Sequence, residues 1–228
     1  MSDAEAQKRA AGMAATELVE AGMTVGLGTG STAAWFVRAL AERRPSIVCV
    51  ATSEATSALA VTLGLQVVDF DRAGEVDLTV DGADEIGPGL ALIKGGGGAL
   101  LREKLVWLAS RRCVVIADAS KLVTALGPFP LPIEVTTFGH QRTAEHIRGV
   151  LHDLGISAAP ALRMDGDAPS RTDGGNLIYD VPCRVIERPA EVAKALKDVT
   201  GVVDHGLFLG LAERALVAGE GGVETIWP

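Results

Sequence analysis

With 228 residues, the chain is long enough for one large domain, or for one domain with a small second one. Its formal net charge of -8 and its lack of a Lys/Arg run argue against nucleic acid as a partner, because binding a phosphate backbone needs clustered positive charge. The three cysteines stand far apart without a CxxC pair, so we expect reduced core residues and no zinc cluster. The chain shows neither a signal-peptide pattern nor an apolar run of membrane-spanning length, and we expect a cytoplasmic protein.

The first half of the chain alternates between helical and strand patterns. A capping-box pattern at Ser2–Glu5 opens the first helix. Predicted helices cover residues 4–21, 31–44, 54–63 and 98–110, and predicted strands cover residues 23–27, 47–51, 66–70, 76–80 and 113–117. Continuous apolar strands separated by helices predict an α/β fold, in which a mostly parallel sheet has helices on both faces.

A proline cluster at residues 127–132 marks a boundary. After it we predict strands at 133–137, about 160–164, 176–181 and 202–205, and helices at 141–154 and 189–198. This βαββαβ order indicates a smaller ferredoxin-like α+β domain, with residues 165–175 as an exposed hairpin loop. The predicted domains are therefore residues 1–128 with 207–228, where short strands return, and residues 129–206.

Residues 94–104 form the most informative segment, because a lysine and four glycines lead from the apolar run at residues 90–93, a predicted strand end, into a helix. Glycine N–H groups can approach a ligand closely, and a helix N-terminus favours anions. Lys94 adds a cation and Glu103 a carboxylate, which suits a small anionic substrate whose chemistry involves proton transfer. Glu103 lies three residues after Leu100 and four before Trp107, on a partly apolar face where desolvation would make a carboxyl group a better base. The alternatives are a flexible glycine loop and an ordinary surface glutamate.

Residues 26–32 follow the first strand and open a helix, but they lack the GxGxxG spacing of a dinucleotide site and the GK[ST] of a P-loop. They could form an anion cradle from backbone N–H groups and the hydroxyls of Thr29, Ser31 and Thr32. A glycine turn with Ser31 as the helix N-cap is an equally good interpretation. Residues 52–54 repeat the pattern more weakly, and helix capping is the better interpretation there.

Two further groups of charged residues follow strands. Asp81, Asp84 and Glu85 crowd a strand end around Gly82, which allows a tight turn that could point both aspartates into one pocket; an ordinary acidic turn is the alternative. Lys121 follows another strand and could add positive charge, or it could simply be solvated. Ligands of such sheets bind beyond the carboxyl ends of the strands, where all these motifs lie.

Taken together, the motifs resemble the A type of ribose-5-phosphate isomerase. The matching segments are residues 26–32, 81–85, 94–104, 117–121 and 129–135, with weaker matches at 172–176 and 201–208. The resemblance implies a Rossmann-like domain with a smaller lid or oligomerisation domain, no cofactor, no metal, and a homodimer or homotetramer. It also implies the reversible isomerisation of D-ribose 5-phosphate to D-ribulose 5-phosphate through an enediolate, in the non-oxidative pentose phosphate pathway.

The resemblance implies a role for each matching position. Glu103 would move the proton between carbons 2 and 1, and Asp81 would assist ring opening and proton movement on the oxygens. Asp84 would orient the substrate, while Lys94 would also stabilise the enediolate. The expected substrate-binding residues are Lys8, Thr29, Gly30, Ser31, Thr32, Asp81, Gly82, Ala83, Asp84, Lys94, Gly95, Gly96, Gly97 and Lys121, with Lys8 the least secure match.

The chain departs from the family pattern at Leu101, where a threonine is common, and at residues 52–54, a looser match to a serine-rich segment; both could alter substrate affinity. Two other functions stay open. A non-catalytic sugar-phosphate sensor should carry a helix-turn-helix and a basic face, and the sequence shows neither. A nucleotide-dependent oxidoreductase is disfavoured by the glycine spacing, with Glu54 as the nearest candidate for a ribose ligand.

Overall fold

The computed structural model describes residues 3–228, so the capping position predicted at Ser2 lies outside the described residues. The chain divides into two compact units. Unit 1 comprises the chain up to Ala83, residues 102–122 and residues 210–228, and unit 2 comprises residues 84–101 and 123–209. The predicted bounds instead assign residues 84–101, 123–128 and 207–209 to the first domain.

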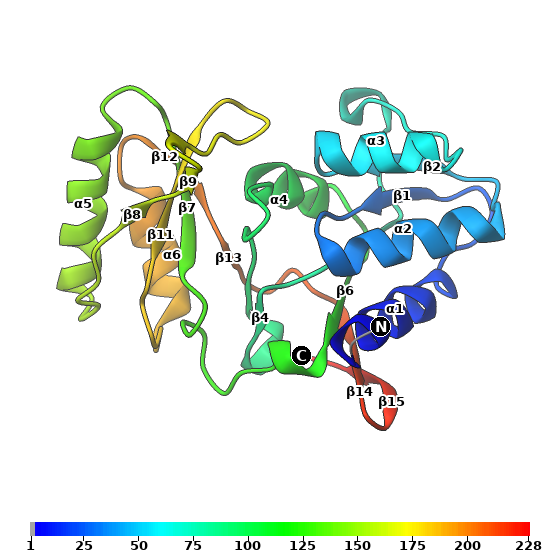
Figure 1. Ribbon diagram of the computed structural model, residues 1–228. Coiled ribbons are helices and arrows are strands. Elements are labelled where there is room, and N and C mark those ends of the chain that lie inside the picture. Colours follow the sequence, from blue (N-terminus) through cyan, green and yellow to red (C-terminus); the bar gives the residue numbers. More distant parts are fainter. Residues whose placement is uncertain (1–2) are drawn as a thin grey trace. The chain divides into compact units, whose positions relative to one another are not determined.

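Unit 1 is built on a six-stranded sheet with the strand order β15-β14-β6-β3-β1-β2 (Figure 1). Neighbouring strands are parallel except for the edge strand β15, which pairs with β14 in the antiparallel direction. The strands are β1 (Thr24–Leu27), β2 (Val48–Ala51), β3 (Leu78–Asp81), β6 (Cys113–Asp118), β14 (Arg214–Gly219) and β15 (Gly222–Ile226). The helices are α1 (Asp3–Thr16), α2 (Ser31–Arg43), α3 (Glu54–Thr62) and α4 (Leu100–Leu108), whose first two residues belong to unit 2. The predicted mainly parallel α/β sheet is confirmed.

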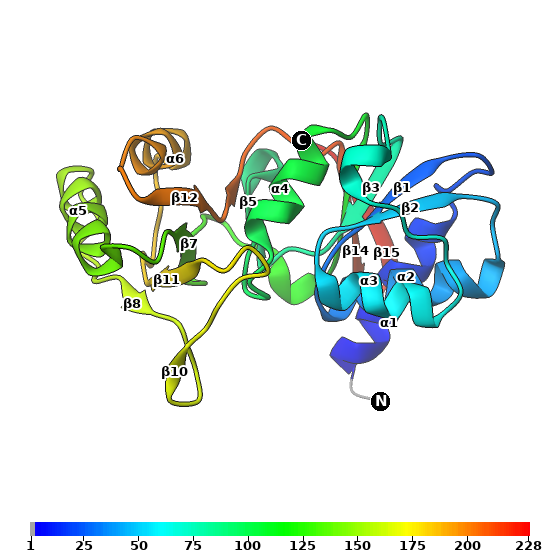
Figure 2. The same cartoon turned by 90° about the horizontal axis from the view of Figure 1, so that it is seen from above.

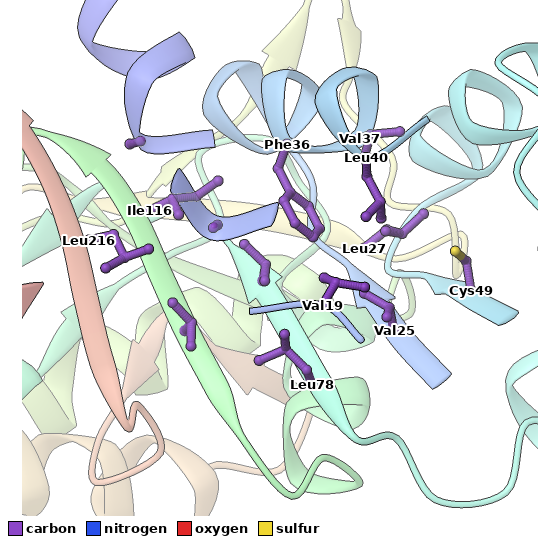
Figure 3. Close-up of a cluster of buried hydrophobic side chains, with 14 of the residues drawn as sticks. Val19, Val25, Leu27, Phe36, Val37, Leu40, Cys49, Leu78, Ile116 and Leu216 are labelled. Carbon is purple, nitrogen blue, oxygen red and sulfur yellow. The ribbon is translucent and has the colours of Figure 1, made fainter. Parts of the chain in front are cut away.

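Helices cover both faces of this sheet. Successive strand residues point to opposite sides, so both faces carry apolar side chains that a helix must bury. On one face, α1, α2 and α3 pack against the strands and lie together on one side of them (Figure 2). Phe36 of α2 points into this cluster, which also holds Leu27 and Leu78 (Figure 3). On the other face, Val106 of α4 packs with Val50 of β2. The strand ends that carry the polar motifs therefore extend from a rigid apolar core.

Unit 2 contains the predicted ferredoxin-like fold. Its four-stranded antiparallel sheet has the order β12-β7-β11-β8, so the βαββαβ strands are arranged 4-1-3-2. The elements are β7 (Leu131–Val135), α5 (His140–Asp153), β8 (Ala161–Leu162), β11 (Leu177–Val181), α6 (Pro189–Lys197) and β12 (Val202–His205). The predicted hairpin loop is largely exposed and contains the strand pair β9 (Met164–Asp165) and β10 (Ala168–Pro169).

Unit 2 also holds a second small sheet, which contains the strand end predicted before Lys94 and one of the short strands predicted from residue 207. It has the order β13-β5-β4 and consists of β4 (Glu85–Ile86), β5 (Leu92–Ile93) and β13 (Leu207–Phe208). Both carboxylate oxygens of Glu85 accept backbone N–H groups, from Gly127 at 2.8 Å and from Phe129. These contacts attach the strand pair β4–β5 to the segment that leads into β7.

Two predicted elements differ from the structure. The first helix ends at Thr16 instead of residue 21, where i→i−3 backbone bonds such as Leu18 N–H to Ala15 replace the helical ones. The guanidinium group of Arg43 donates to the carbonyl group of Thr16 at that end. The strand predicted at 66–70 is reduced to a single bridge from Val67 to Cys49. There the Asp69 carboxylate accepts the N–H of Asp71 at 2.9 Å and starts a 3-10 turn, which ends the extended backbone.

The three cysteines are buried thiols that form no disulfide, as predicted. Burial raises the pKa of the Cys49 thiol to about 12. The pKa of Cys183 rises to about 11, mainly through burial and also through the charge of Glu85. Both thiols are therefore protonated near neutral pH and act as core residues. Within residues 3–228, no helix combines the length and the apolar character needed to cross a bilayer.

Candidate active site

Asp81 is the last residue of β3, and its side chain is fully buried. Its Oδ1 atom accepts the backbone N–H of Thr29 at 3.1 Å and that of Gly82 at 2.7 Å. Its Oδ2 atom lies 3.4 Å from the indole Nε1 of Trp107. Three N–H donors therefore hold this carboxylate in a fixed orientation.

A cluster of hydroxyl groups holds the neighbouring loop after β1. The Thr29 Oγ1 atom lies 2.8 Å from Thr52 Oγ1, 2.8 Å from Ser53 Oγ and 3.1 Å from Thr56 Oγ1. The Ser53 hydroxyl also accepts the N–H of Thr56 at 3.0 Å as the N-cap of α3, which confirms the capping role predicted for this segment. Sequence reasoning missed the contact with Thr29, because nothing in the spacing of these residues shows that the two strand ends meet.

The predicted anion cradle lies at the N-terminus of α2. The helix begins at Ser31, with Gly30 as its N-cap at a φ of 114° and with no side-chain cap. The alternative that Ser31 is the N-cap is therefore wrong. Ser31 is exposed and Thr32 is 9% exposed, so the first turn of α2 presents N–H groups and a hydroxyl group at the end of β1.

Glu103 lies in the first turn of α4 and is 4% exposed, so the interpretation as a surface glutamate is wrong. Trp107 follows four residues later on the same helix face and is 1% exposed. The end of α4 is anchored to the sheet, because the Cys113 thiol donates to the Trp107 carbonyl group at 3.4 Å. A hydrogen bond of 2.7 Å between Ser110 and Thr79 adds a second attachment to β3.

In unit 2, Lys94 follows β5 and is 2% exposed. Its backbone N–H donates to the Gly206 carbonyl group at 2.9 Å, and its Nζ lies 5.4 Å from the centre of the Phe208 ring. A Cβ atom at position 206 would lie 2.2 Å from the Lys94 carbonyl oxygen, so this close approach requires glycine. The lysine is thereby held between backbone and an aromatic face.

Hydrogen bonds to Asp84 and Arg163 hold the glycine loop after Lys94. The N–H of Gly96 donates to Asp84 Oδ2 at 2.7 Å, as expected if Asp84 and the loop belong to one site. Arg163 donates to the carbonyl groups of Gly95 at 2.9 Å and Gly96 at 3.1 Å. Its guanidinium group also pairs with Asp180, with Nε 2.8 Å from Oδ2. Arg163 was not predicted, because its position beside a hairpin gives no sign of contact with a loop 67 residues earlier.

The remaining predicted site residues are divided between the units. Lys8 on α1 and Lys121, at the end of the 3-10 helix that follows β6, are half-buried residues of unit 1. Unit 1 also holds Asp81, Gly82, Ala83, Glu103 and residues 29–32, whereas unit 2 holds Asp84, Lys94 and residues 95–97. Direct contacts join Asp81 to Thr29 and Gly82 in the first unit, and Asp84 to Gly96 in the second.

Glu54 is the candidate ribose ligand of the oxidoreductase alternative. Its carboxylate lies 3.4 Å from the guanidinium group of Arg102. Both residues line a cavity of about 490 Å³ in unit 1, together with Phe70 and Leu105.

Among the residues that the structure describes, no group of three His, Cys, Asp or Glu side chains could hold a metal ion.

Comparisons with known proteins point to one family. The model of the family described as ribose 5-phosphate isomerase A (phosphoriboisomerase A) matches residues 48–222. A ribose-5-phosphate isomerase A from Caulobacter sp. (strain K31) is 60% identical over 225 residues, which are 99% of each chain. The protein of the same name from Sinorhizobium fredii (strain NBRC 101917 / NGR234) is 50% identical and covers 98% of each chain.

Solved structures show the same similarity. The crystal structure of ribose 5-phosphate isomerase A from Neisseria gonorrhoeae has a TM-score of 0.91 and 34% identity, and covers 100% of this chain and 99% of that chain. A D-ribose-5-phosphate isomerase solved in complex with phospho-erythronic acid has a TM-score of 0.91 and 33% identity, with 100% of both chains covered. The likeness therefore includes both units.

Proposed function

The chain belongs to the ribose 5-phosphate isomerase A family and catalyses the aldose–ketose isomerisation of D-ribose 5-phosphate to D-ribulose 5-phosphate, and we propose that Glu103 is its base. The observation that carries this proposal is the burial of Glu103 in the first turn of α4, in the unit that also holds the Asp81 carboxylate. A desolvated carboxylate is a stronger base than one in water. One carboxylate that moves a proton between neighbouring carbons is the main requirement of this reaction.

In this proposal, Glu103 removes the proton from carbon 2 of the open-chain aldose and returns it to carbon 1. The electron pair of the broken C–H bond forms the enediolate, whose negative charge rests on the oxygens of carbons 1 and 2. Asp81 transfers a proton between those two oxygens and assists the preceding ring opening. Glu103 thus moves the proton on carbon, and Asp81 moves the proton on oxygen.

Unit 2 would supply the oxyanion stabilisation. Lys94 has its ammonium group near the Phe208 ring and is 2% exposed, so its charge is weakly screened by water. We propose that Lys94 and the N–H groups of Gly95 and Gly97 stabilise the enediolate, while Asp84, which accepts the Gly96 N–H, orients the substrate hydroxyl groups. Donors that are ordered before the reaction stabilise developing charge without further reorganisation, and the contacts of Gly95 and Gly96 with Arg163 support such order.

The phosphate group would bind at the N-terminus of α2. Residues 29–32 offer backbone N–H groups and hydroxyl groups there, and the hydroxyl cluster around Thr29 fixes the loop. Gly82 and Ala83 would contribute backbone contacts, and Lys121 and Lys8 positive charge. This local set of donors explains how a chain with a net charge of -8 could bind an anion.

The proposal is tested by Glu103→Gln. The amide has nearly the same shape but cannot accept the proton, so kcat should fall by at least about 10²-fold while the fold is retained. Turnover of ribose 5-phosphate is measured with a chelator present and no cofactor added, and circular dichroism checks the fold. Glu42→Gln, at an exposed position on α2, is the matched control and should keep wild-type turnover. A Glu103→Gln protein within a few-fold of wild type would remove Glu103 from the role of base.

Turnover of the wild-type protein, together with a DNA mobility assay, separates the enzyme from a sugar-phosphate sensor. A sensor would bind the sugar phosphate without turnover and would shift the mobility of DNA, whereas we expect turnover and no shift. We propose phospho-erythronic acid as a competitive inhibitor here, because it is bound in the structure of a relative and its carboxylate resembles the two oxygens of an enediolate. A KM for ribose 5-phosphate that does not rise with this acid would contradict that assignment.

We also propose that the chain assembles into a homodimer or homotetramer. The exposed apolar side chains of the described residues are compatible with contacts between copies; Phe138, for example, is 95% exposed. Light scattering coupled to size-exclusion chromatography gives the mass directly, and a value near the 23.6 kDa of one chain would exclude both assemblies.

A further inference from the structure

Trp107 combines a buried ring with a polar contact to a proposed catalytic carboxylate. Its side chain is 1% exposed, and its indole Nε1–H donates to Asp81 Oδ2 at 3.4 Å. A buried indole N–H usually has a hydrogen-bond partner. The partner here is the residue that is proposed to move protons on the substrate oxygens.

The two oxygens of Asp81 have different surroundings. Oδ1 accepts two backbone N–H groups, from Thr29 and Gly82, and a carboxylate oxygen has about two lone-pair sites. Proton exchange with the substrate is therefore assigned to Oδ2, the oxygen that Trp107 contacts. The indole sets the plane of the carboxylate and hence the direction in which Oδ2 meets a substrate hydroxyl group.

Trp107 and Glu103 also share one helix. They are four residues apart on α4, so they lie on the same face, with Trp107 one turn further along. The Trp107 carbonyl group accepts the Cys113 thiol at 3.4 Å, which attaches this turn to β6. A single anchored helix thus carries the proposed base and the donor that orients the second carboxylate.

We propose that Trp107 is a positioning residue, whose indole N–H orients the Asp81 carboxylate for proton transfer between the substrate oxygens. This inference rests on the role proposed above for Asp81. The 3.4 Å distance lies at the long end of the range for an N–H···O hydrogen bond, so the contact can orient the carboxylate. The effect belongs to the chemical step, so it should appear in kcat and leave KM almost unchanged.

The test is a double-mutant cycle with Trp107→Phe and Asp81→Asn. Phenylalanine keeps an aromatic ring but removes the N–H, and kcat for ribose 5-phosphate should fall about tenfold with KM within about twofold. Asp81→Asn should lower kcat by at least about 10²-fold. In the Asp81→Asn background the Trp107→Phe change should alter kcat by less than about twofold, because the carboxylate through which Trp107 acts is already absent.

Trp35→Phe is the matched control. Trp35, on α2, also donates its indole N–H to a carboxylate at 2.6 Å, but its partner is Glu5 Oε1 on α1. It should keep wild-type kcat. A second variant carries 3-benzothienylalanine at position 107, which replaces the N–H by sulfur with almost no change of shape. It should reproduce the loss in kcat with an unfolding temperature close to that of the wild type, which separates the hydrogen bond from packing.

The outcomes are distinct. Wild-type kcat in Trp107→Phe and in the benzothienylalanine protein, with Asp81→Asn impaired, would overturn the inference and leave the proposed function intact. A tenfold loss that recurs in the Asp81→Asn background would show that Trp107 acts independently of Asp81, and would also overturn it. Near wild-type turnover of Asp81→Asn would instead refute the role proposed for Asp81, and the inference with it.

Discussion

Gly28 stands at the end of β1, beside the carboxylate of Asp81. A Cβ atom at this position would lie 2.1 Å from Asp81 Oδ1 and 2.5 Å from the Asp81 Cα atom, so neither a side-chain rotation nor a small shift could accommodate it. The absence of a side chain at position 28 therefore allows the Thr29 N–H to reach Asp81. At the scale of single residues, the site depends as much on missing side chains as on the charged ones.

We predict that Gly28→Ala lowers kcat by at least about 10²-fold, because Asp81 must move away from its donors. The same change should lower the free energy of unfolding by about 1–3 kcal/mol, as overpacking in a core does. Gly149→Ala is the matched control, since Gly149 lies in α5 with nothing within 4 Å of the added Cβ atom. It should leave kcat unchanged and stabilise the protein by up to about 1 kcal/mol, as alanine does in a helix. Kinetics and urea unfolding of both variants distinguish the two effects, and an active Gly28→Ala protein would contradict the first.

At the scale of elements, strands β6 and β14 are joined near their first residues by a carboxylate between two guanidinium groups. Glu213 Oε2 accepts Arg112 Nε at 2.8 Å, and Glu213 Oε1 accepts Arg214 Nε at 3.0 Å. The hydrogen bond from Arg112, followed by that from Arg214, outweighs burial and lowers the pKa of Glu213. A lowered pKa in the folded state means that ionised Glu213 stabilises the fold above the pKa of an unfolded glutamate, and that this contribution disappears as the pH falls.

We predict that Glu213→Gln lowers the free energy of unfolding by about 1 kcal/mol at pH 7, a modest value because solvent screens these partly exposed groups. The difference from wild type should shrink at a pH below about 4, where the wild-type carboxylate becomes protonated. Urea unfolding at both pH values measures it. Glu224→Gln, on the exposed side of the edge strand β15, should have no comparable effect at either pH. A difference that grows as the pH falls would contradict the assigned sign.

The accuracy of the sequence predictions also depends on the element. The strand at 113–117 was predicted almost to the residue, because a continuous apolar run of this length fits a buried parallel strand. Strand β4 was missed, since a two-residue strand is too short for any periodicity, whereas β5 lies in the apolar run at residues 90–93 that predicts a strand end. Asp81 and Glu103 could be selected because strand ends and helix starts are where such folds place their ligands. Arg163 and the N–H contact of Trp107 could not, because both depend on tertiary packing between segments far apart in the sequence.

At the scale of the whole molecule, neither unit is a continuous piece of chain. The chain changes unit after residues 83, 101, 122 and 209. The change after residue 101 lies inside α4, which begins in unit 2 and carries Glu103 in unit 1. Because a helix forms cooperatively, the start of α4 and the turn that carries Glu103 should fold together.

We therefore predict that the two units unfold in a single transition in urea. The three tryptophans, Trp35, Trp107 and Trp227, all belong to unit 1, so tryptophan fluorescence reports its unfolding. Hydrogen exchange of peptides from residues 131–205 reports the unfolding of the ferredoxin-like fold in unit 2. The two midpoints should coincide, and turnover should disappear at the same urea concentration, because loss of unit 2 would remove the first residues of α4 together with Lys94. A lower midpoint for residues 131–205, with tryptophan fluorescence still native, would instead show that unit 1 keeps its fold without unit 2, and that α4 does not couple them.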